Sequence, residues 1–151
     1  MKLLRKPQIN AVLISVISAF YALIFIFVSG HLEFNRLFSS GKTLNSNFWN
    51  GWSDFLKQGN LKYIGYAYII LALAVVVFSL IKKQEYDEYQ ISIFEKGIMI
   101  MGATMVLLFP LALILVLSDR TYCVETLMLL CVAHWSIVLV ADLIYAIKYS
   151  R

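Results

Sequence analysis

Four long apolar runs constrain the fold of this chain more than any other feature of its sequence. The runs cover residues 9–30, 63–81, 97–118 and 122–147. A helix needs about 20 mostly apolar residues to cross a bilayer core that is about 30 Å thick. Backbone groups find no water in that core, and the runs lack the period-two alternation of membrane β-strands. Each run is therefore predicted to be a transmembrane helix.

The composition of the chain agrees with this interpretation. Of the 151 residues, 61% are hydrophobic and 15% are charged, and the mean hydropathy is +0.78. A soluble domain carries about 45–50% apolar and roughly 25% charged residues. We therefore predict an all-α integral membrane protein, a four-helix transmembrane bundle that forms one domain over residues 1–151. The same composition excludes a disordered chain, a disulfide scaffold and a nucleic-acid-binding domain.

The basic residues that flank the spans predict the orientation of the chain. Eight lysines and arginines lie at the N-terminus, in the connection between the second and third spans and in the tail, whereas five lie on the other side. Positive residues gather on the cytoplasmic side of membrane proteins. A multi-pass protein of the cell membrane with both termini cytoplasmic is therefore predicted. A cleaved signal peptide is the alternative for the first run, but that run is long for a signal and no A-x-A site follows it.

The connection over residues 33–60 is long for a compact membrane bundle and is predicted to lie outside the cell. A helix is predicted within it at about residues 47–58, with Ser46 or Asn47 as its cap and Gly59 at its end. Its large apolar side chains share one face at about 100° per residue. These side chains are Phe48, Trp49, Trp52, Phe55 and Leu56, and the opposite face carries Asn50, Ser53, Asp54 and Lys57.

Such an amphipathic, aromatic-rich helix is typical of a segment that lies flat in the headgroup region of a bilayer. Two roles follow for it. It anchors the loop to the outer leaflet, or it acts as a lid or as a docking surface for a partner, because long loops in compact domains are often functional.

Small residues recur along three of the spans. They are Ala11, Ser15, Ser18, Ala22 and Ser29 in the first, Gly65, Ala72 and Ser79 in the second, and Gly102, Ala103 and Ala112 in the third. Small side chains let membrane helices approach closely. These faces predict tight helix packing, with a partner helix in the same chain or in a neighbouring one.

The third span has two further features. The acidic segment 85–90 precedes it and is predicted to be a helical extension into the cytosol, either a solvated face or a docking site. Pro110 lies inside the span and has no N–H to donate, which frees the carbonyl of Val106 and predicts a kink. The kink is structural, or it serves as a gating hinge or an exposed carbonyl site.

The fourth span carries the candidate chemistry. Cys131, His134, Asp142 and Tyr145 follow one another at roughly helical spacing. Ionisable side chains are costly inside a membrane and are therefore candidates for function. Facing a wet cavity, this polar stripe could relay protons or bind a cation, because imidazole changes its charge near physiological pH.

A structural interpretation of the same residues stands beside it. His134 is then neutral and hydrogen-bonded to a neighbouring helix, and Asp142 pairs near the inner headgroups with Lys82, Lys83 or Arg5. Glu125, at the start of the same span, is predicted only to favour the helix dipole.

Metal binding and catalysis are not predicted. Cys131 and His134 supply two ligands at most, whereas zinc needs three or four, and no nucleophile signature surrounds them. Cys123 lies too far along the same helix to bridge Cys131. It is predicted to be a small hydrophobe or a partner for a cysteine of another chain. No metal, cofactor or catalytic residue is therefore assigned.

The sequence leaves three classes of function. The first is a non-enzymatic membrane subunit that forms an oligomer or serves another membrane protein as an accessory or regulatory part. The second is an ion- or proton-coupled channel or transporter that uses His134 and Asp142. The third is an intramembrane enzyme. This class is disfavoured because spans of about 20 residues each leave no room for a soluble catalytic domain. The partners expected are the lipid bilayer and a second copy or another membrane protein, with no nucleic acid.

Overall fold

The computed structural model of the protein describes residues 7–38, 45–81, 88–118 and 120–150, and almost all of them are helical. The helices are α1 (Pro7–Ser29), α2 (Leu32–Asn35), α3 (Asn47–Lys57), α4 (Leu61–Ile81), α5 (Glu88–Ser118), the short 3-10 helix η1 (Arg120–Tyr122) and α6 (Cys123–Ser150). Among these, α1, α4, α5 and α6 are long and apolar enough to cross a membrane. The predicted all-α class and the four long apolar helices are confirmed.

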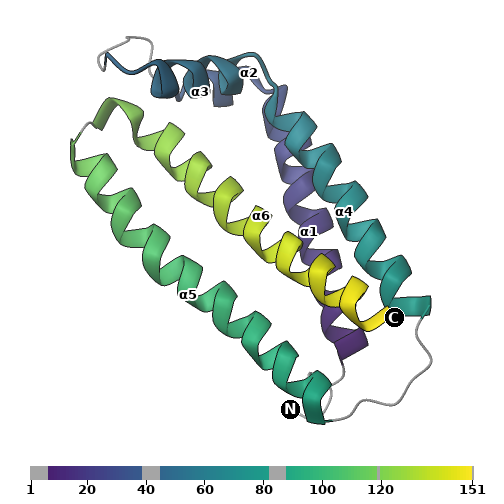
Figure 1. The fold of residues 1–151 in the computed structure, drawn as a ribbon. Helices are drawn as coiled ribbons and strands as arrows, with labels where there is room; N and C mark the ends of the chain where they lie inside the picture. Colours follow the sequence, from purple (N-terminus) through teal and green to yellow (C-terminus); the bar gives the residue numbers. More distant parts are fainter. Residues whose placement is uncertain (1–6, 39–44, 82–87, 119, 151) are drawn as a thin grey trace.

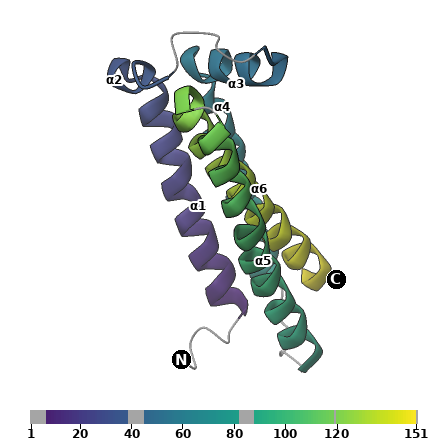
Figure 2. The same ribbon diagram turned by 90° about the vertical axis from the view of Figure 1, so that its left-hand side faces the viewer.

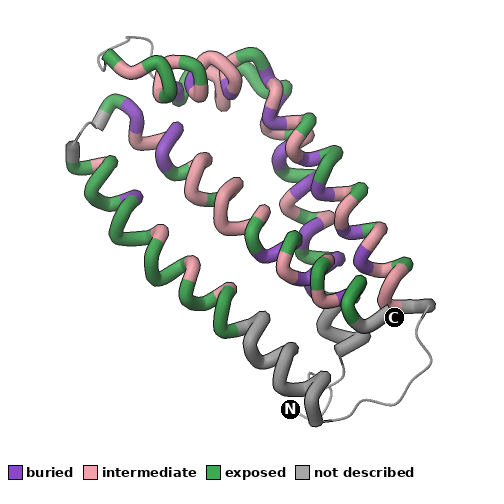
Figure 3. The backbone as a smooth tube through the Cα atoms, viewed as in Figure 1, coloured by how far each residue is buried: buried purple, intermediate pink, exposed green. Residues whose placement is uncertain are grey.

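The long helices do not share one core equally. Helices α1, α4 and α6 pack together around a cluster of buried side chains that includes Phe25, Tyr68 and Leu139. Helix α5 packs against α6 and stands apart from α1 and α4 (Figure 1). Exposed residues accordingly run along most of the part of α5 whose burial is described, residues 99–117 (Figure 3). The described part of the molecule is a three-helix core with a fourth helix on one side.

Helices α2 and α3 lie across one end of the long helices, and Figure 2 shows this arrangement from the side. We call this the capped end. The Ser46 hydroxyl accepts a hydrogen bond from the backbone N–H of Trp49 at 3.5 Å and begins α3. Beyond its end, Gly59 has a φ of +72°, a conformation that favours glycine. The predicted start and end signals of the loop helix are both confirmed.

The close approach of α1 and α4 depends on glycine. A Cβ atom at Gly65 would lie 2.8 Å from the carbonyl oxygen of Ala22 and 2.9 Å from Cγ1 of Ile26. Ala22 itself is fully buried, and Ala72 on α4 is also buried. Because lipid is as apolar as the side chains, membrane helices are held by such packing rather than by exclusion of water.

The end of α1 is tied to the start of α4 by one side chain. The Ser29 hydroxyl donates to the carbonyl oxygen of Gly59 and accepts from the backbone N–H of Lys62 at 3.3 Å. Ser29 is 3% exposed, so these bonds are shielded from solvent. The loop that carries α2 and α3 therefore leaves and re-enters the bundle at one fixed point.

The small residues of α5 behave differently from those of α1 and α4. A Cβ atom at Gly102 would meet nothing within 4 Å, and Ala103 is exposed. Only Ala112 is buried in the stretch from Met99 to Leu117. The predicted small-residue packing therefore holds within this chain for α1 and α4, whereas Gly102 and Ala103 face away from it.

Substitution of Gly65 by alanine is expected to lower the free energy of unfolding in mixed micelles by about 1–3 kcal/mol, because the new methyl group meets a backbone oxygen. Gly102→Ala is the matched control, since it adds the same methyl group to open space. Equal stabilities for the two variants would contradict the close α1–α4 contact.

Candidate functional site

A group of polar contacts joins α3 to η1 and to the start of α6. The Ser53 hydroxyl donates to Oε1 of Glu125 at 2.9 Å, and the Trp52 indole N–H donates to the Glu125 carbonyl oxygen at 2.9 Å. The Tyr122 hydroxyl donates to Oδ1 of Asn50, also at 2.9 Å. We call these five residues the α3–α6 junction. They fix the loop helix across the capped end.

Glu125 is the centre of the junction and is fully buried. A buried carboxylate is costly unless hydrogen bonds compensate it. The Ser53 hydroxyl supplies one such bond. Glu125 lies in the first turn of α6, as the sequence predicted, and in addition it accepts a hydrogen bond from α3 that the sequence did not reveal. An acidic side chain one turn inside an apolar span was the available signal, but its partner lies 72 residues away.

The apolar residues of α3 are distributed around the junction. Leu56 is fully buried, and Trp52 and Phe55 stack at 5.5 Å between ring centroids and pack against the core cluster. Trp49 lies 6.0 Å from the Tyr122 ring, whereas Phe48 is 59% exposed. Most of the predicted apolar face therefore contacts the bundle.

Ser53 differs from its predicted position. The sequence placed it on the polar face of α3, away from the apolar side chains, but it is 3% exposed and directed at Glu125. The hydrogen bond to a buried carboxylate compensates the burial of the hydroxyl group. Helical spacing alone could not reveal this, because the partner belongs to another helix.

A second set of hydrogen bonds joins the three core helices at mid-length. The Tyr68 hydroxyl on α4 donates to the carbonyl oxygen of Val132 at 2.9 Å and lies 2.9 Å from Oγ of Ser136 on α6. From the same turn of α6, the Trp135 indole N–H donates to Oγ of Ser18 on α1 at 3.1 Å. Each of α1 and α4 is therefore bonded to α6.

Aromatic rings fill the space around these bonds. Tyr21 stacks on Trp135 with ring centroids 4.5 Å apart and an interplanar angle of 18°. Phe25 lies 6.3 Å from Tyr21 and 5.8 Å from Tyr68, measured between ring centroids. Such pairs add to stability beyond the area that they bury. The middle of the core is packed by side chains from all three helices.

The residues of the predicted polar stripe occupy different surroundings. Cys131 is exposed, His134 and Tyr145 are partly buried, and Asp142 is 4% exposed. Eight residues separate His134 from Asp142, which corresponds to about 12 Å along a helix and about 80° around it. Asp142 lies in the buried face with Leu139 and Ala146, so the four residues do not share one environment.

Two atoms of this region lack a hydrogen-bond partner among the residues that the structure describes. They are Nδ1 of His134 and Oδ2 of Asp142, both shielded from solvent. The predicted partners of Asp142, which are Lys82, Lys83 and Arg5, lie outside the described residues. The pairing of Asp142 with one of these residues stays a prediction.

The two cysteines are both free, with Cys123 partly buried and Cys131 exposed. Over the ranges 7–38, 45–81, 88–118 and 120–150, no three histidine, cysteine or acidic side chains come together as metal ligands. Comparison with protein-family models, with curated proteins and with solved structures finds no match. The function is therefore inferred from the residues themselves.

Replacement of Tyr68 by phenylalanine is expected to lower the free energy of unfolding by about 1 kcal/mol, because it removes the hydroxyl that bonds α4 to α6. Tyr66→Phe is the control, since Tyr66 is 47% exposed. Unfolding in mixed micelles measures both. A Tyr68→Phe protein as stable as the control would show that this bond does not hold the core.

The α3–α6 junction is expected to depend on an acceptor at position 125. Glu125→Leu removes the acceptor of Ser53, so amide hydrogen exchange over residues 47–57 should rise while α4 stays protected. Glu125→Gln keeps a carbonyl oxygen and should retain most of the protection. The exposed Glu33 provides a control substitution, Glu33→Gln. Unaltered exchange of α3 in Glu125→Leu would contradict the junction.

Proposed function

We propose that the protein is a small non-enzymatic subunit of the cell membrane that assembles with copies of itself or with another membrane protein. Both termini are cytoplasmic in this proposal, because basic residues gather on that side. The capped end then lies outside the cell. Each span uses about 20 residues, so the four spans take up more than half of the 151 residues.

The observation that carries this proposal is the unequal use of the four apolar helices. At mid-length, the polar side chains Tyr68, Trp135 and Ser18 hold α1, α4 and α6 together. In contrast, the stretch of α5 from Met99 to Leu117 is only 6% buried and contains no charged side chain. A helix outside its own core, with Gly102 facing open space, is suited to contact another membrane helix.

Exposed apolar side chains at the capped end support a position at the membrane surface. Leu32 is 75%, Leu37 61% and Phe48 59% exposed. Large apolar groups at the end of a span suit the headgroup boundary. We propose that α3 lies at this boundary as an anchor of the loop, held from within by the α3–α6 junction.

Asp142 favours a second candidate, an ion- or proton-coupled channel or transporter. It is buried in the core, and Oδ2 has no hydrogen-bond partner among the described residues. A carboxyl group in that position needs a proton, a cation or a basic partner. His134 would contribute to the same path only from a different side of α6.

The reactivity of Cys131 distinguishes the two candidates. A membrane-impermeant thiol reagent is applied to each side of oriented vesicles that hold the Cys123→Ser protein. Cys131 is exposed on α6, so assembly in lipid predicts no labelling in the bilayer and full labelling after denaturation. The control is Phe48→Cys in a protein from which both native cysteines have been removed. It should be labelled from the outer side only.

Labelling of Cys131 in the folded protein from either side would mean that this part of α6 lines an aqueous path. That result would contradict the assembly proposal and favour permeation. Proton flux in Asp142→Asn and His134→Gln would then identify the residues that serve the path.

A further inference from the structure

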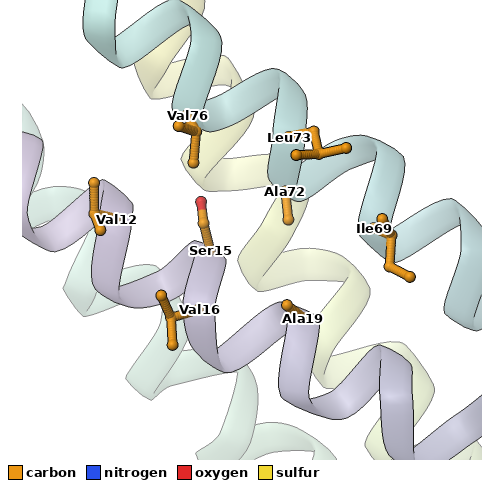
Figure 4. Close-up of a pocket in the computed structure, with 8 residues that line it drawn as sticks. All are labelled: Val12, Ser15, Val16, Ala19, Ile69, Ala72, Leu73 and Val76. Carbon is orange, nitrogen blue, oxygen red and sulfur yellow. The ribbon is translucent and has the colours of Figure 1, made fainter.

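The outer surface of the α1–α4 pair contains a groove of about 190 Å³. It is lined by Ser15, Val16 and Ala19 from α1 and by Ala72, Leu73 and Val76 from α4. Figure 4 views this groove with α6 behind α1 and α4, so it opens away from α6. Helix α5 packs against α6 and stands apart from α1 and α4 (Figure 1), so α5 lies on the side of the molecule away from the groove.

Ser15 is the polar feature of this groove. It is 5% exposed, and its hydroxyl has no hydrogen-bond partner among the residues that the structure describes. Its neighbour Ser18 bonds to the carbonyl oxygen of Ile14 one turn earlier, as serine commonly does in membrane helices. In Figure 4 the Ser15 oxygen points between the two helices. An occupant of the groove that brings an acceptor would satisfy it.

Helix α5 holds an acceptor of the required kind. Because Pro110 has no N–H, the carbonyl of Val106 loses its ordinary partner in the helix. Val106 is 72% exposed, so this part of α5 faces away from α6. The helix continues through Pro110. Backbone carbonyls freed by proline in membrane helices are bonded by neighbouring helices or by serine and threonine side chains.

The donor and the acceptor lie at similar distances from the ends of their helices. Ser15 is fourteen residues before the end of α1 at Ser29, which corresponds to about 21 Å. Val106 is twelve residues before the end of α5 at Ser118, or about 18 Å. Both helices run toward the capped end (Figure 1). In two copies with one membrane orientation, both groups therefore lie about 18–21 Å along their helices from the capped end.

We propose that α5 of a second copy of this chain occupies the α1–α4 groove, with the Val106 carbonyl of that copy accepting a hydrogen bond from Ser15. This inference rests on the assembly function proposed above and names its partner. The groove floor of Ser15, Ala19 and Ala72 admits a close approach of the incoming helix. Because groove and α5 lie on opposite sides, the contact is head-to-tail and generates a ring or a linear array.

Cross-linking between two differently tagged copies tests the contact. Both copies lack the native cysteines, through Cys123→Ser and Cys131→Ala. One carries Leu73→Cys at the groove, and the other carries Val106→Cys on α5. Each position is twelve residues from the end of its helix at the capped end. In the control pair, Ile17→Cys on α1 takes the place of Leu73→Cys. Ile17 is exposed and is also twelve residues from the end of its helix at the capped end.

A short bifunctional thiol reagent in vesicles is expected to give at least a several-fold greater yield of the mixed product for the groove pair than for the control pair. An oligomer that forms without this product overturns the inference and leaves the assembly function in place. If the chain stays monomeric in vesicles and retains no membrane partner, that result overturns both the groove contact and the assembly function.

The hydrogen bond is tested separately by association measured through energy transfer between labelled copies. Ser15→Ala removes the donor, and Pro110→Ala returns an N–H to the Val106 carbonyl. Each is expected to weaken association about threefold, the usual effect of one interhelical hydrogen bond in a membrane. The double variant should lose no more than either single variant, because both remove the same bond. Independent losses that multiply, or no loss, would contradict the Ser15–Val106 contact.

Discussion

The contact between α1 and α4 at Gly65 is the constraint on which the rest of the structure depends. A glycine there lets the α4 backbone approach the Ala22 carbonyl more closely than any side chain would allow. That approach places Ser29 within reach of Gly59 and Lys62, which fixes where the loop meets the bundle. The same close approach holds α1 and α4 together as the pair against which α6 packs. In lipid, where exclusion of water does not drive helices together, such close packing is the main source of cohesion.

Polar side chains then serve as connections between helices. Tyr68 and Trp135 bond α6 to α4 and to α1, and both belong to a region filled by stacked aromatic rings. Glu125 likewise connects two helices at the capped end, where it accepts a hydrogen bond from the Ser53 hydroxyl of α3. Polar groups buried without compensation are costly, so these bonds specify one arrangement of the helices. Helix α5 takes part in neither set, and this separation supports its assignment to contacts beyond its own chain.

The sequence predicted the features that depend on local chemistry. The length of the apolar runs gave the four long helices, and Ser46 and Gly59 marked the limits of α3 because capping and positive φ are properties of single residues. The pairing of Ser53 with Glu125 could not be predicted, since it joins residues 72 positions apart. The polar stripe on α6 stays a prediction, but the burial of its members could not be predicted for a related reason. Spacing suggested a shared face, but neighbouring helices decide which of those side chains is buried, and they bury Asp142 while leaving Cys131 exposed.

In the proposed function, the protein works as part of a membrane assembly. The most direct measurement counts the labelled copies in each complex, from the photobleaching steps of single particles in a bilayer at a low ratio of protein to lipid. The account predicts spots that bleach in more than one step, or spots that contain one copy bound to a different membrane protein. Single-step bleaching throughout, with no bound membrane protein and with the protein folded, would contradict it.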